Sequence, residues 1–396
     1  MNDDKVVIVS AKRTPIGSFQ GNFESLKATE LGSRVIEKNI NDISINPKEI
    51  DETIMGCVLP AGLGQAPARQ AAMGAGIPSE SGATTINKMC GSGMKSIMFG
   101  HDSIKAKQNN IVVAGGLENM TNAPYILSKA RKGFRMGHAD VKDHMFLDGL
   151  EDAYDEGKLM GSFAEDTAEH YQFTREQQDN FAITSLERAK KANEDGTFEA
   201  EIVPIKVLNR KNEIIINKDE QPFKSDITKI PTLKPAFRKN GTVTAANSSS
   251  ISDGASSVIL MLESEAQKRG IKPLARIIDH STNSQEPKWF TTAPIGAIEK
   301  VLEKSGWKKT DVDLFEVNEA FAVVPMAVMK DIGISNDILN IYGGACALGH
   351  PVGASGTRIV TTLINALKKN NLKKGVASLC IGGGEATALT LEIINW

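Results

Sequence analysis

The sequence is poor in cysteine, in aromatic residues and in net charge, and each shortage excludes a class of protein. Only four of the 396 residues are cysteine, with no C-x-x-C pair and no zinc-type histidine spacing, so we expect neither a disulfide scaffold nor a metal site. Aromatic residues make up 5% and the net charge is −2, so the chain lacks the stacking platforms and the basic surface that bind nucleic acid. No nucleic-acid partner is therefore expected.

Long hydrophobic runs and targeting signals are also lacking. No apolar run approaches the roughly 18 to 20 residues that span a bilayer. The acidic start, MNDDK, leads into a Val- and Ile-rich stretch without the basic and apolar regions of a signal peptide. We therefore expect a cytoplasmic protein with no membrane partner, in which Cys57, Cys90, Cys346 and Cys380 are reduced thiols.

The pattern that is present is an alternation of apolar runs with segments of helical period. Strands are predicted at 6–10, 52–58, 84–87 and 111–115, and again at 314–318, 338–342 and 376–381. Helices are predicted at 94–107, after a G-S-G turn, and at 357–369, after G-A-S-G, and both end in lysines. This is an internal repeat with an offset of about 260 residues, and it predicts an α/β fold of two similar halves with parallel strands.

The segment between the repeats, residues 121–250, differs in texture. It is richer in charge, contains a helical pattern at 175–195, and is interrupted by prolines 222, 231 and 235. We interpret it as an insertion that carries ligand loops. Its basic patch of Lys129, Arg131, Lys132 and Arg135 fits either a solvated loop or a role in oligomer contacts or phosphate attraction.

Cys90 is a candidate nucleophile because it lies between a predicted strand and a predicted helix. The free N–H groups and partial positive charge of a helix N-terminus are expected to lower the pKa of a thiol there. Simple core packing is the alternative for an isolated cysteine in such a place.

Two glycine-rich stretches point to a shared site. The first, GGACALGHPVGASG at 343–356, surrounds His350, and histidine is well suited to take a thiol proton near pH 7. The second places Cys380 before three glycines at a strand end. A dinucleotide fingerprint is rejected there, because G-x-G-x-x-G is absent and no acidic residue follows at the required distance.

Asn318 follows the predicted strand 314–318 directly. An amide at a strand end can orient a water or a carbonyl without titrating, which suits an oxyanion site. The alternative is a helix N-cap at Asn318 with Glu319 in the first turn.

Taken together, these stretches resemble the thiolase family over nearly the whole chain. The matching motifs are INKMCGSG at 86–93, NEAF at 318–321, GHP at 349–351 with GASG at 353–356, and CIGGG at 380–384. Within that family, GFRMG at 133–137 and DGL at 148–150 are similar to the short-chain, biosynthetic branch. The resemblance implies the five-layered thiolase fold and no tightly bound cofactor.

The resemblance also implies a reaction and its residues. Two acetyl-CoA would condense to acetoacetyl-CoA and CoA, reversibly, with Cys90 as the acyl-carrying nucleophile, His350 as its base and Cys380 as the base for the α-proton. His350 and a water on Asn318 would hold the enolate oxygen, and the N–H groups of Cys90 and Gly382 the tetrahedral intermediate. We expected glycine at 382 because a side chain would block that N–H.

Coenzyme A contacts carried over from the family are Leu150, Phe237, Ala245, Ser249, Ala320 and Phe321, with Lys224 in place of a missing arginine. Core packing is the alternative for each apolar one. The chain departs from the branch at Leu159, Phe223, Ala246, Ser248, Trp289, Phe290 and Tyr342, which leaves the acyl-chain preference and the nucleotide contacts open.

Two rival functions remain open at this stage: a degradative thiolase for longer acyl chains, and a non-catalytic thiolase-like carrier or scaffold. The second is expected to lack one of the catalytic cysteines or the histidine, and all three are present. We expect residues 1–120 with 251–272 and residues 273–396 to form the two halves, and 121–250 to form a loop domain. We expect the chain to be a homo-oligomer, a tetramer built from dimers.

Overall fold

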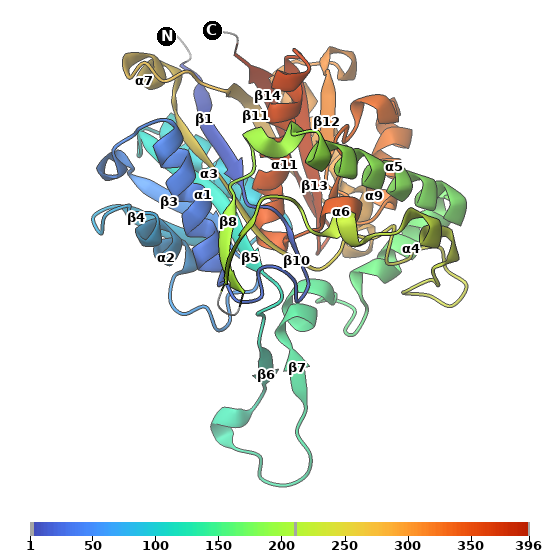
Figure 1. The fold of residues 1–396 in the computed structure, drawn as a ribbon. Coiled ribbons are helices and arrows are strands. Elements are labelled where there is room, and N and C mark those ends of the chain that lie inside the picture. Colours follow the sequence, from blue (N-terminus) through green and yellow to red (C-terminus); the bar gives the residue numbers. More distant parts are fainter. Residues whose placement is uncertain (1–3, 210–211, 395–396) are drawn as a thin grey trace.

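The computed structural model describes residues 4–209 and 212–394 and shows two α/β halves side by side (Figure 1). The strands of the first half, in spatial order, are β4 (Gly82–Ile86), β3 (Glu52–Gly56), β5 (Ile111–Asn119), β10 (Ser252–Leu262) and β1 (Val6–Arg13). Those of the second are β11 (Ala275–Ser284), β14 (Glu385–Ile393), β13 (Lys374–Ile381) and β12 (Leu314–Val317). The short β2 (Gly17–Ser18) pairs with β10.

A short antiparallel ladder joins the two halves into one continuous sheet. It links β1 to β11 through two residue pairs, Val7 with Arg276 and Ile8 with Ala275. Every residue of β5 is buried, as expected for a strand covered on both faces.

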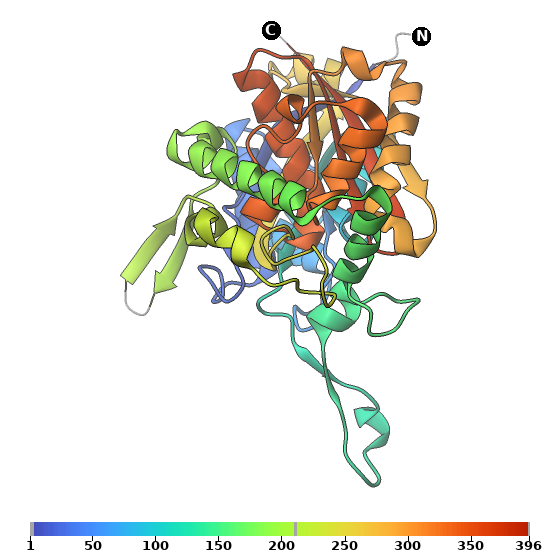
Figure 2. The ribbon, with the colours of Figure 1, turned by 90° about the vertical axis from the view of Figure 1, so that its right-hand side faces the viewer.

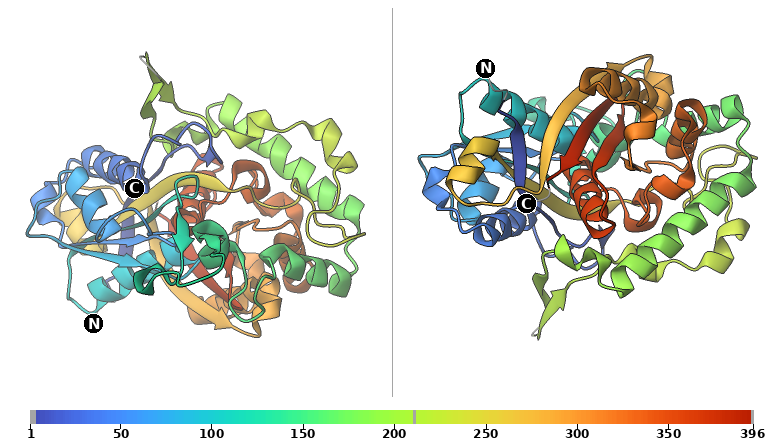
Figure 3. Two further views of the ribbon diagram at one scale, coloured as in Figure 1. Left: turned by 90° about the horizontal axis from the view of Figure 1, so that it is seen from below. Right: turned by 90° about the horizontal axis from the view of Figure 1, so that it is seen from above.

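Helices cover both faces of the sheets and fill the space between them, which gives five layers (Figure 3). The middle layer consists of α3 (Ser92–Lys105) and α11 (Val352–Lys369), whose apolar residues pack with strands of both halves. Outside the first half lie α1 (Ala28–Asp42) and α2 (Pro67–Gly74), and outside the second lie α8 (Ala293–Ser305) and α9 (Val323–Val328). The predicted fold is confirmed.

The glycines of the two repeated turns let the middle helices touch backbone to backbone. A Cβ built on Gly93 would lie 2.8 Å from the amide nitrogen of Thr357, and one on Gly356 would collide with that of Met94. The sequence motifs therefore place the N-terminal ends of α3 and α11 against each other.

The predicted strand order differs from the structure in two respects. Among the described strands, the parallel pairs are β3 with β4, β3 with β5, and β12 with β13. The strands β10, β11 and β14, which were not predicted, enter antiparallel. The predicted strand 338–342 is wrong. A 3-10 helix, Asn336–Ile338, comes first, and the Asn340 side chain then takes the place of a strand, exchanging hydrogen bonds of 2.8 Å with N and O of Val317.

The inserted segment adds loops, short helices and two hairpins. The π-helix Phe146–Leu150 precedes α4 (Met160–Tyr171) and α5 (Arg175–Glu194), which is the predicted helix 175–195. One hairpin, β6 (Tyr125–Leu127) with β7 (Val141–Asp143), projects far from the body, and β8 (Ile205–Asn209) with β9 (Asn212–Ile216) projects from another side (Figure 2). The remaining short helices are α6 (Gln221–Lys224), α7 (Glu263–Lys268) and α10 (Ala345–Leu348). Within the described ranges, no helix combines the length and the apolar character needed to cross a bilayer.

Candidate active site

A cavity of about 410 Å³ opens where the first half, the second half and the inserted segment meet. Cys90, His350 and Gly382 line it together with apolar side chains of the π-helix and α4. A larger open groove, of about 610 Å³, lies near Lys12 and Arg269, but its described lining contains neither cysteine nor histidine. The smaller cavity is therefore the candidate active site.

Cys90 lies in the turn between β4 and α3, and Met89 before it has a left-handed φ of +47°. The expectation that the helix N-terminus lowers its pKa is wrong. Burial raises the pKa of the Cys90 thiol to about 11, although the N–H groups of Gly382 and of Cys90 itself act in the opposite direction. At neutral pH the sulfur is therefore a thiol that needs a base.

The triple glycine after β13 places the Gly382 N–H against the Cys90 sulfur. A Cβ at Gly382 would meet only the Met160 sulfur, at 3.5 Å, and both residues line the cavity, so the blocking of the N–H by a side chain at 382 stays a prediction. Gly383 and Gly384 have φ of +93° and +88°, and a Cβ on Gly384 would collide with the Gln285 carbonyl. The strain that requires glycine thus falls on these two residues, which turn the chain so that the Gly382 N–H faces the cavity.

His350 is held as a neutral imidazole with one nitrogen free. Its Nδ1 lies 2.5 Å from Ser355 Oγ, which in turn donates to the Pro351 carbonyl at 3.0 Å. Since that hydroxyl proton is used, Nδ1 must carry the ring proton and Nε2 the lone pair. Nε2 is buried and has no hydrogen-bond partner among the described residues. Burial, assisted by the charge of Arg358, lowers the pKa of His350 to about 3.

Asn318 is buried at the end of β12 with its amide nitrogen also unpartnered in the part of the chain that the structure describes. Arg358 on α11 donates to Asn318 Oδ1 at 3.5 Å and to Glu316 Oε1 at 2.9 Å. This orientation leaves Nδ2 as a free donor. The N-cap alternative is wrong, because α9 begins only at Val323.

Cys380 is the second thiol near the cavity. It is fully buried near the end of β13, close enough to Cys90 for the two charges to interact. Burial, with a contribution from Cys90, raises its pKa well above the ordinary value. Cys380 is therefore mainly a protonated thiol at neutral pH.

Two buried carboxylates that the sequence analysis missed organise the loops around these groups. Glu118 accepts hydrogen bonds from the N–H groups of Val58, Leu59 and Gly353 at 2.9 to 3.1 Å, and burial raises its pKa to about 7 despite them. Glu319 accepts from Ser185, Asn340 and the Cys346 amide. Neither carries a local signal, because their partners lie far away in the sequence.

The expected coenzyme A contacts fall into two places. Six of the seven line the cavity: Leu150, Phe237, Ala245, Ser249, Ala320 and Phe321. Lys224 lies instead in an adjoining pocket that shares Gln221, Ala245 and Ser250 with the cavity, and it pairs with Glu220 at 2.5 Å.

The residues at which the chain differs from the short-chain branch also lie in different places. Leu159, Ser248 and Phe290 line the cavity. Trp289 packs against His170, and the Tyr342 hydroxyl accepts a hydrogen bond from the Asn370 side-chain amide while its ring contacts Phe198. Phe223 lies on the surface, and Ala246 lines the adjoining pocket. Only the first three can affect the acyl group directly.

A five-layered α/β fold that brings a thiol and a neutral imidazole to one cavity, with a second buried thiol close to the first, is typical of an enzyme that transfers acyl groups through cysteine. The family models for the thiolase N-terminal domain and C-terminal domain match residues 6–264 and 271–393. The chain belongs to the thiolase family, and its assignment as an acyltransferase is confirmed.

Relatives and solved structures agree over the full length. The chain is 50% identical to "Probable acetyl-CoA acetyltransferase" of Dictyostelium discoideum, covering 99% of this chain and 94% of that one. It is 48% identical to "Acetyl-CoA acetyltransferase 2" of Arabidopsis thaliana, covering 100% and 98%. The solved Bacillus anthracis acetyl-CoA acetyltransferase superposes with a TM-score of 0.96 at 40% identity, over 99% of both chains. The Acat5 thiolase of Ascaris suum, solved in complex with coenzyme A, superposes with a TM-score of 0.93 at 41% identity, over 98% and 100%.

Proposed function

We propose that the protein is an acetyl-CoA C-acetyltransferase that condenses two acetyl-CoA to acetoacetyl-CoA and CoA and catalyses the thiolytic reverse. The observation that carries this proposal is that Cys90 and His350 line one cavity, with His350 Nε2 free among the described residues and a second thiol, Cys380, buried close to Cys90. A condensation needs both a nucleophile that holds the first acyl group and a base that deprotonates the second.

In the first half-reaction, His350 Nε2 takes the Cys90 proton, and the thiolate attacks the thioester carbonyl carbon. The N–H groups of Cys90 and Gly382, which already face the sulfur, hold the developing oxyanion. The proton then passes from His350 to the departing CoA sulfur. One thioester is exchanged for another, so this step is nearly balanced in free energy.

In the second half-reaction, Cys380 reacts as its thiolate, the minor form of a thiol whose pKa burial raises, and removes a proton from the methyl group of a second acetyl-CoA. The enolate oxygen faces His350 and a water held by Asn318, whose Nδ2 has no hydrogen-bond partner in residues 4–209 and 212–394. The enolate carbon attacks the acetyl group on Cys90, and the released Cys90 thiolate regains a proton from Cys380. Removing one oxyanion donor from such a site typically costs about 2.7 to 4 kcal/mol in the transition state.

Coenzyme A thioesters are the substrates, and no tightly bound cofactor is invoked. The six cavity-lining contacts would hold the pantetheine, and Lys224 in the adjoining pocket would meet a phosphate. The CoA named in the Ascaris suum structure supports this ligand class.

The short acyl chain is favoured over the longer chains of a degradative thiolase by the bulk at the cavity. Phe290 and Leu159 both line it, and Phe290 is fixed against Phe163 and Phe321. Overfilling a packed site costs about 1 to 3 kcal/mol, so longer chains should be poorer substrates.

We propose a homo-oligomer, assembled as a tetramer from dimers, through the inserted segment 121–250 and the edge of the first half. The β6–β7 hairpin exposes Tyr125, Leu127, Val141 and Met136, the last 95% exposed. Apolar side chains on a projecting hairpin favour burial against a second copy.

We also propose that the chain divides into three parts: residues 1–120 with 251–272, residues 121–250, and residues 273–396. A reducing, cytoplasmic compartment follows from the need for Cys90 and Cys380 as free thiols.

The experiment that tests the function is intact and peptide mass spectrometry after incubation with acetyl-CoA. One acetyl group should appear on Cys90, and Cys90→Ala should lose both the adduct and turnover. Cys346→Ala is the matched control, because this thiol is half-buried in the adjoining pocket and should leave both unchanged. An adduct on another residue, or turnover in Cys90→Ala, would contradict the proposal.

A further inference from the structure

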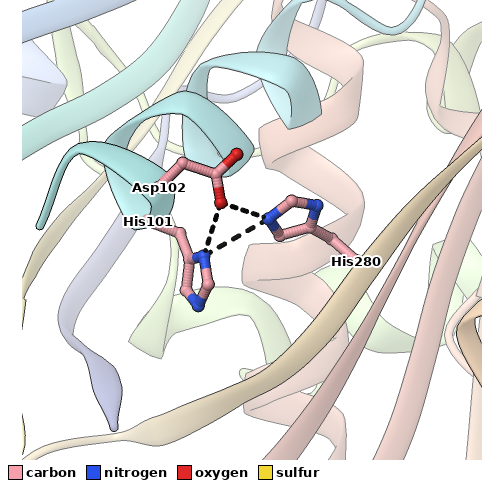
Figure 4. Close-up of side chains that lie close together, drawn as sticks. All are labelled: His101, Asp102 and His280. Carbon is pink, nitrogen blue, oxygen red and sulfur yellow. Dashed lines mark hydrogen bonds and ion pairs between the residues drawn. The ribbon is translucent and has the colours of Figure 1, made fainter. Parts of the chain in front are cut away.

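Three side chains that the proposed reaction does not use converge between the two halves (Figure 4). His101 and Asp102 lie near the C-terminal end of α3, and His280 lies on β11. His101 Nδ1 is 3.0 Å from Asp102 Oδ1, His280 Nε2 is 2.9 Å from the same oxygen, and the two nitrogens are 3.3 Å apart. This cluster lies about 15 Å along α3 from Cys90, outside the cavity.

Both ring nitrogens lie against the same carboxylate oxygen. If both carry hydrogen, Asp102 Oδ1 accepts two N–H bonds, and if only one does, the lone pair of the other nitrogen faces the carboxylate oxygen at 3.0 Å or less. A cation in the centre would be bound by all three atoms at once.

The dimensions fit a transition-metal ion. Three atoms with these separations can all lie about 2.0 to 2.1 Å from one point just outside their plane, which is the Zn–N and Zn–O bond length. Two imidazoles and one carboxylate match the preference of Zn²⁺ and its neighbours rather than that of Ca²⁺ or Mg²⁺, which take oxygen ligands.

The three side chains differ in exposure, and this difference leaves one side of the cluster open for a further ligand. The histidine side chains are 15% and 13% exposed, so they are held by the surrounding fold. Asp102 is 56% exposed and leaves the outer side of the cluster open to water, which can complete a tetrahedral shell.

We propose that His101, Asp102 and His280 form a binding site for Zn²⁺ or a similar divalent transition-metal ion. The site links α3, which follows Cys90 in the first half, to β11 in the second half. Bound metal would clamp the middle helix to the far sheet beside the short β1–β11 ladder. No metal was expected from the sequence, since it has no C-x-x-C pair and no zinc-type histidine spacing. His280 lies 179 positions from His101, so the cluster follows no local motif.

The test is equilibrium dialysis of the whole protein against Zn²⁺, with thermal unfolding in the same buffers. The variants are His101→Asn, His280→Asn and Asp102→Asn, and the control is His138→Asn, an exposed histidine of the projecting hairpin. The wild-type chain and His138→Asn should bind one Zn²⁺ that raises the unfolding midpoint. Each cluster variant should weaken that binding at least about tenfold and lose the shift.

Any Zn²⁺ that binds to Cys90 or Cys380 would bind equally in all of these variants. Substitution with Co²⁺ distinguishes that binding from binding to the cluster. Cobalt in the proposed site has nitrogen and oxygen ligands, so its spectrum lacks thiolate charge transfer. Asp102→Asn changes an exposed side chain and should fold even if a histidine variant does not. Unchanged Zn²⁺ affinity in Asp102→Asn and in the folded histidine variants would overturn the proposal. Acetyl-CoA turnover is measured in the same samples, so that a failure to bind Zn²⁺ at the cluster is distinguished from a failure of the proposed activity.

Discussion

Phe290→Ala should shift the substrate range toward longer acyl chains. The ring lines the cavity, is only 3% exposed, and packs edge to face against Phe163 and Phe321 with centroids 6.3 and 6.5 Å away. Its removal opens apolar space next to the acyl group, and each buried methylene contributes about 0.8 kcal/mol. A six-carbon 3-ketoacyl-CoA has two more methylenes than acetoacetyl-CoA, so the kcat/KM ratio of the two should rise roughly 15-fold.

The assay is thiolysis of four-, six- and eight-carbon 3-ketoacyl-CoA, compared as ratios so that a loss of active protein cancels. Truncating a buried phenylalanine also costs about 3 to 5 kcal/mol of stability, so Phe290→Leu serves as a milder variant. Phe163→Ala is the matched control, since Phe163 packs in the same cluster but does not line the cavity. A chain-length profile unchanged in Phe290→Ala, or shifted equally in Phe163→Ala, would refute the reasoning.

Three further predictions concern the reacting groups. Cys380→Ser should preserve acetyl transfer to Cys90 but slow deuterium exchange into the methyl group of acetyl-CoA by about 10² or more, measured by mass spectrometry; equal loss of both would contradict the division of roles. Ser355→Ala should lower kcat/KM by up to about tenfold without changing the fold, because the ring proton of His350 loses its partner; an unchanged rate would show that Ser355 does not set the tautomer. The free energy of unfolding of His350→Gln, measured with urea, should fall less at acidic pH than that of the wild-type protein. The native pKa of about 3 lies below the unfolded value of 6.5, so wild-type stability falls as pH drops from 6.5 toward 3, by about 2 kcal/mol at pH 5 from this group; parallel pH profiles would contradict this.

The residues that bear the chemistry could be located from sequence because they lie in short, glycine-marked stretches at strand ends. Cys90, His350 and Gly382 line one cavity, which agrees with the predicted shared site, and Asn318 and Cys380 lie at or near the ends of their strands, as expected. Their protonation could not be predicted, since it depends on burial by residues from the whole chain. The helix N-terminus at Cys90 indicated a thiolate, and the pKa raised by burial reverses that conclusion.

The supporting residues had no signal in the sequence for a similar reason. Glu118 looks like the end of an apolar strand, and its partner Gly353 lies 235 positions away. The strand β10 was missed because it begins with small polar residues, SDGASS, which read as a loop although all of them are buried in the sheet. The pattern of one sequence indicates local periodicity, whereas the role of Glu118 and the pairing of β10 depend on residues far away in the sequence.

The position of β10 has a consequence for synthesis of the chain. This strand lies between β1 and β5, yet about 130 residues separate it in the sequence from the end of β5. At 5 to 20 residues per second, a ribosome makes that stretch in about 7 to 26 s. During this interval β1 and β5 each present an unpaired edge toward a gap in the sheet, and such edges pair readily with other chains. The first half can close only after the inserted segment has been made, so its nascent form is a natural client for chaperones.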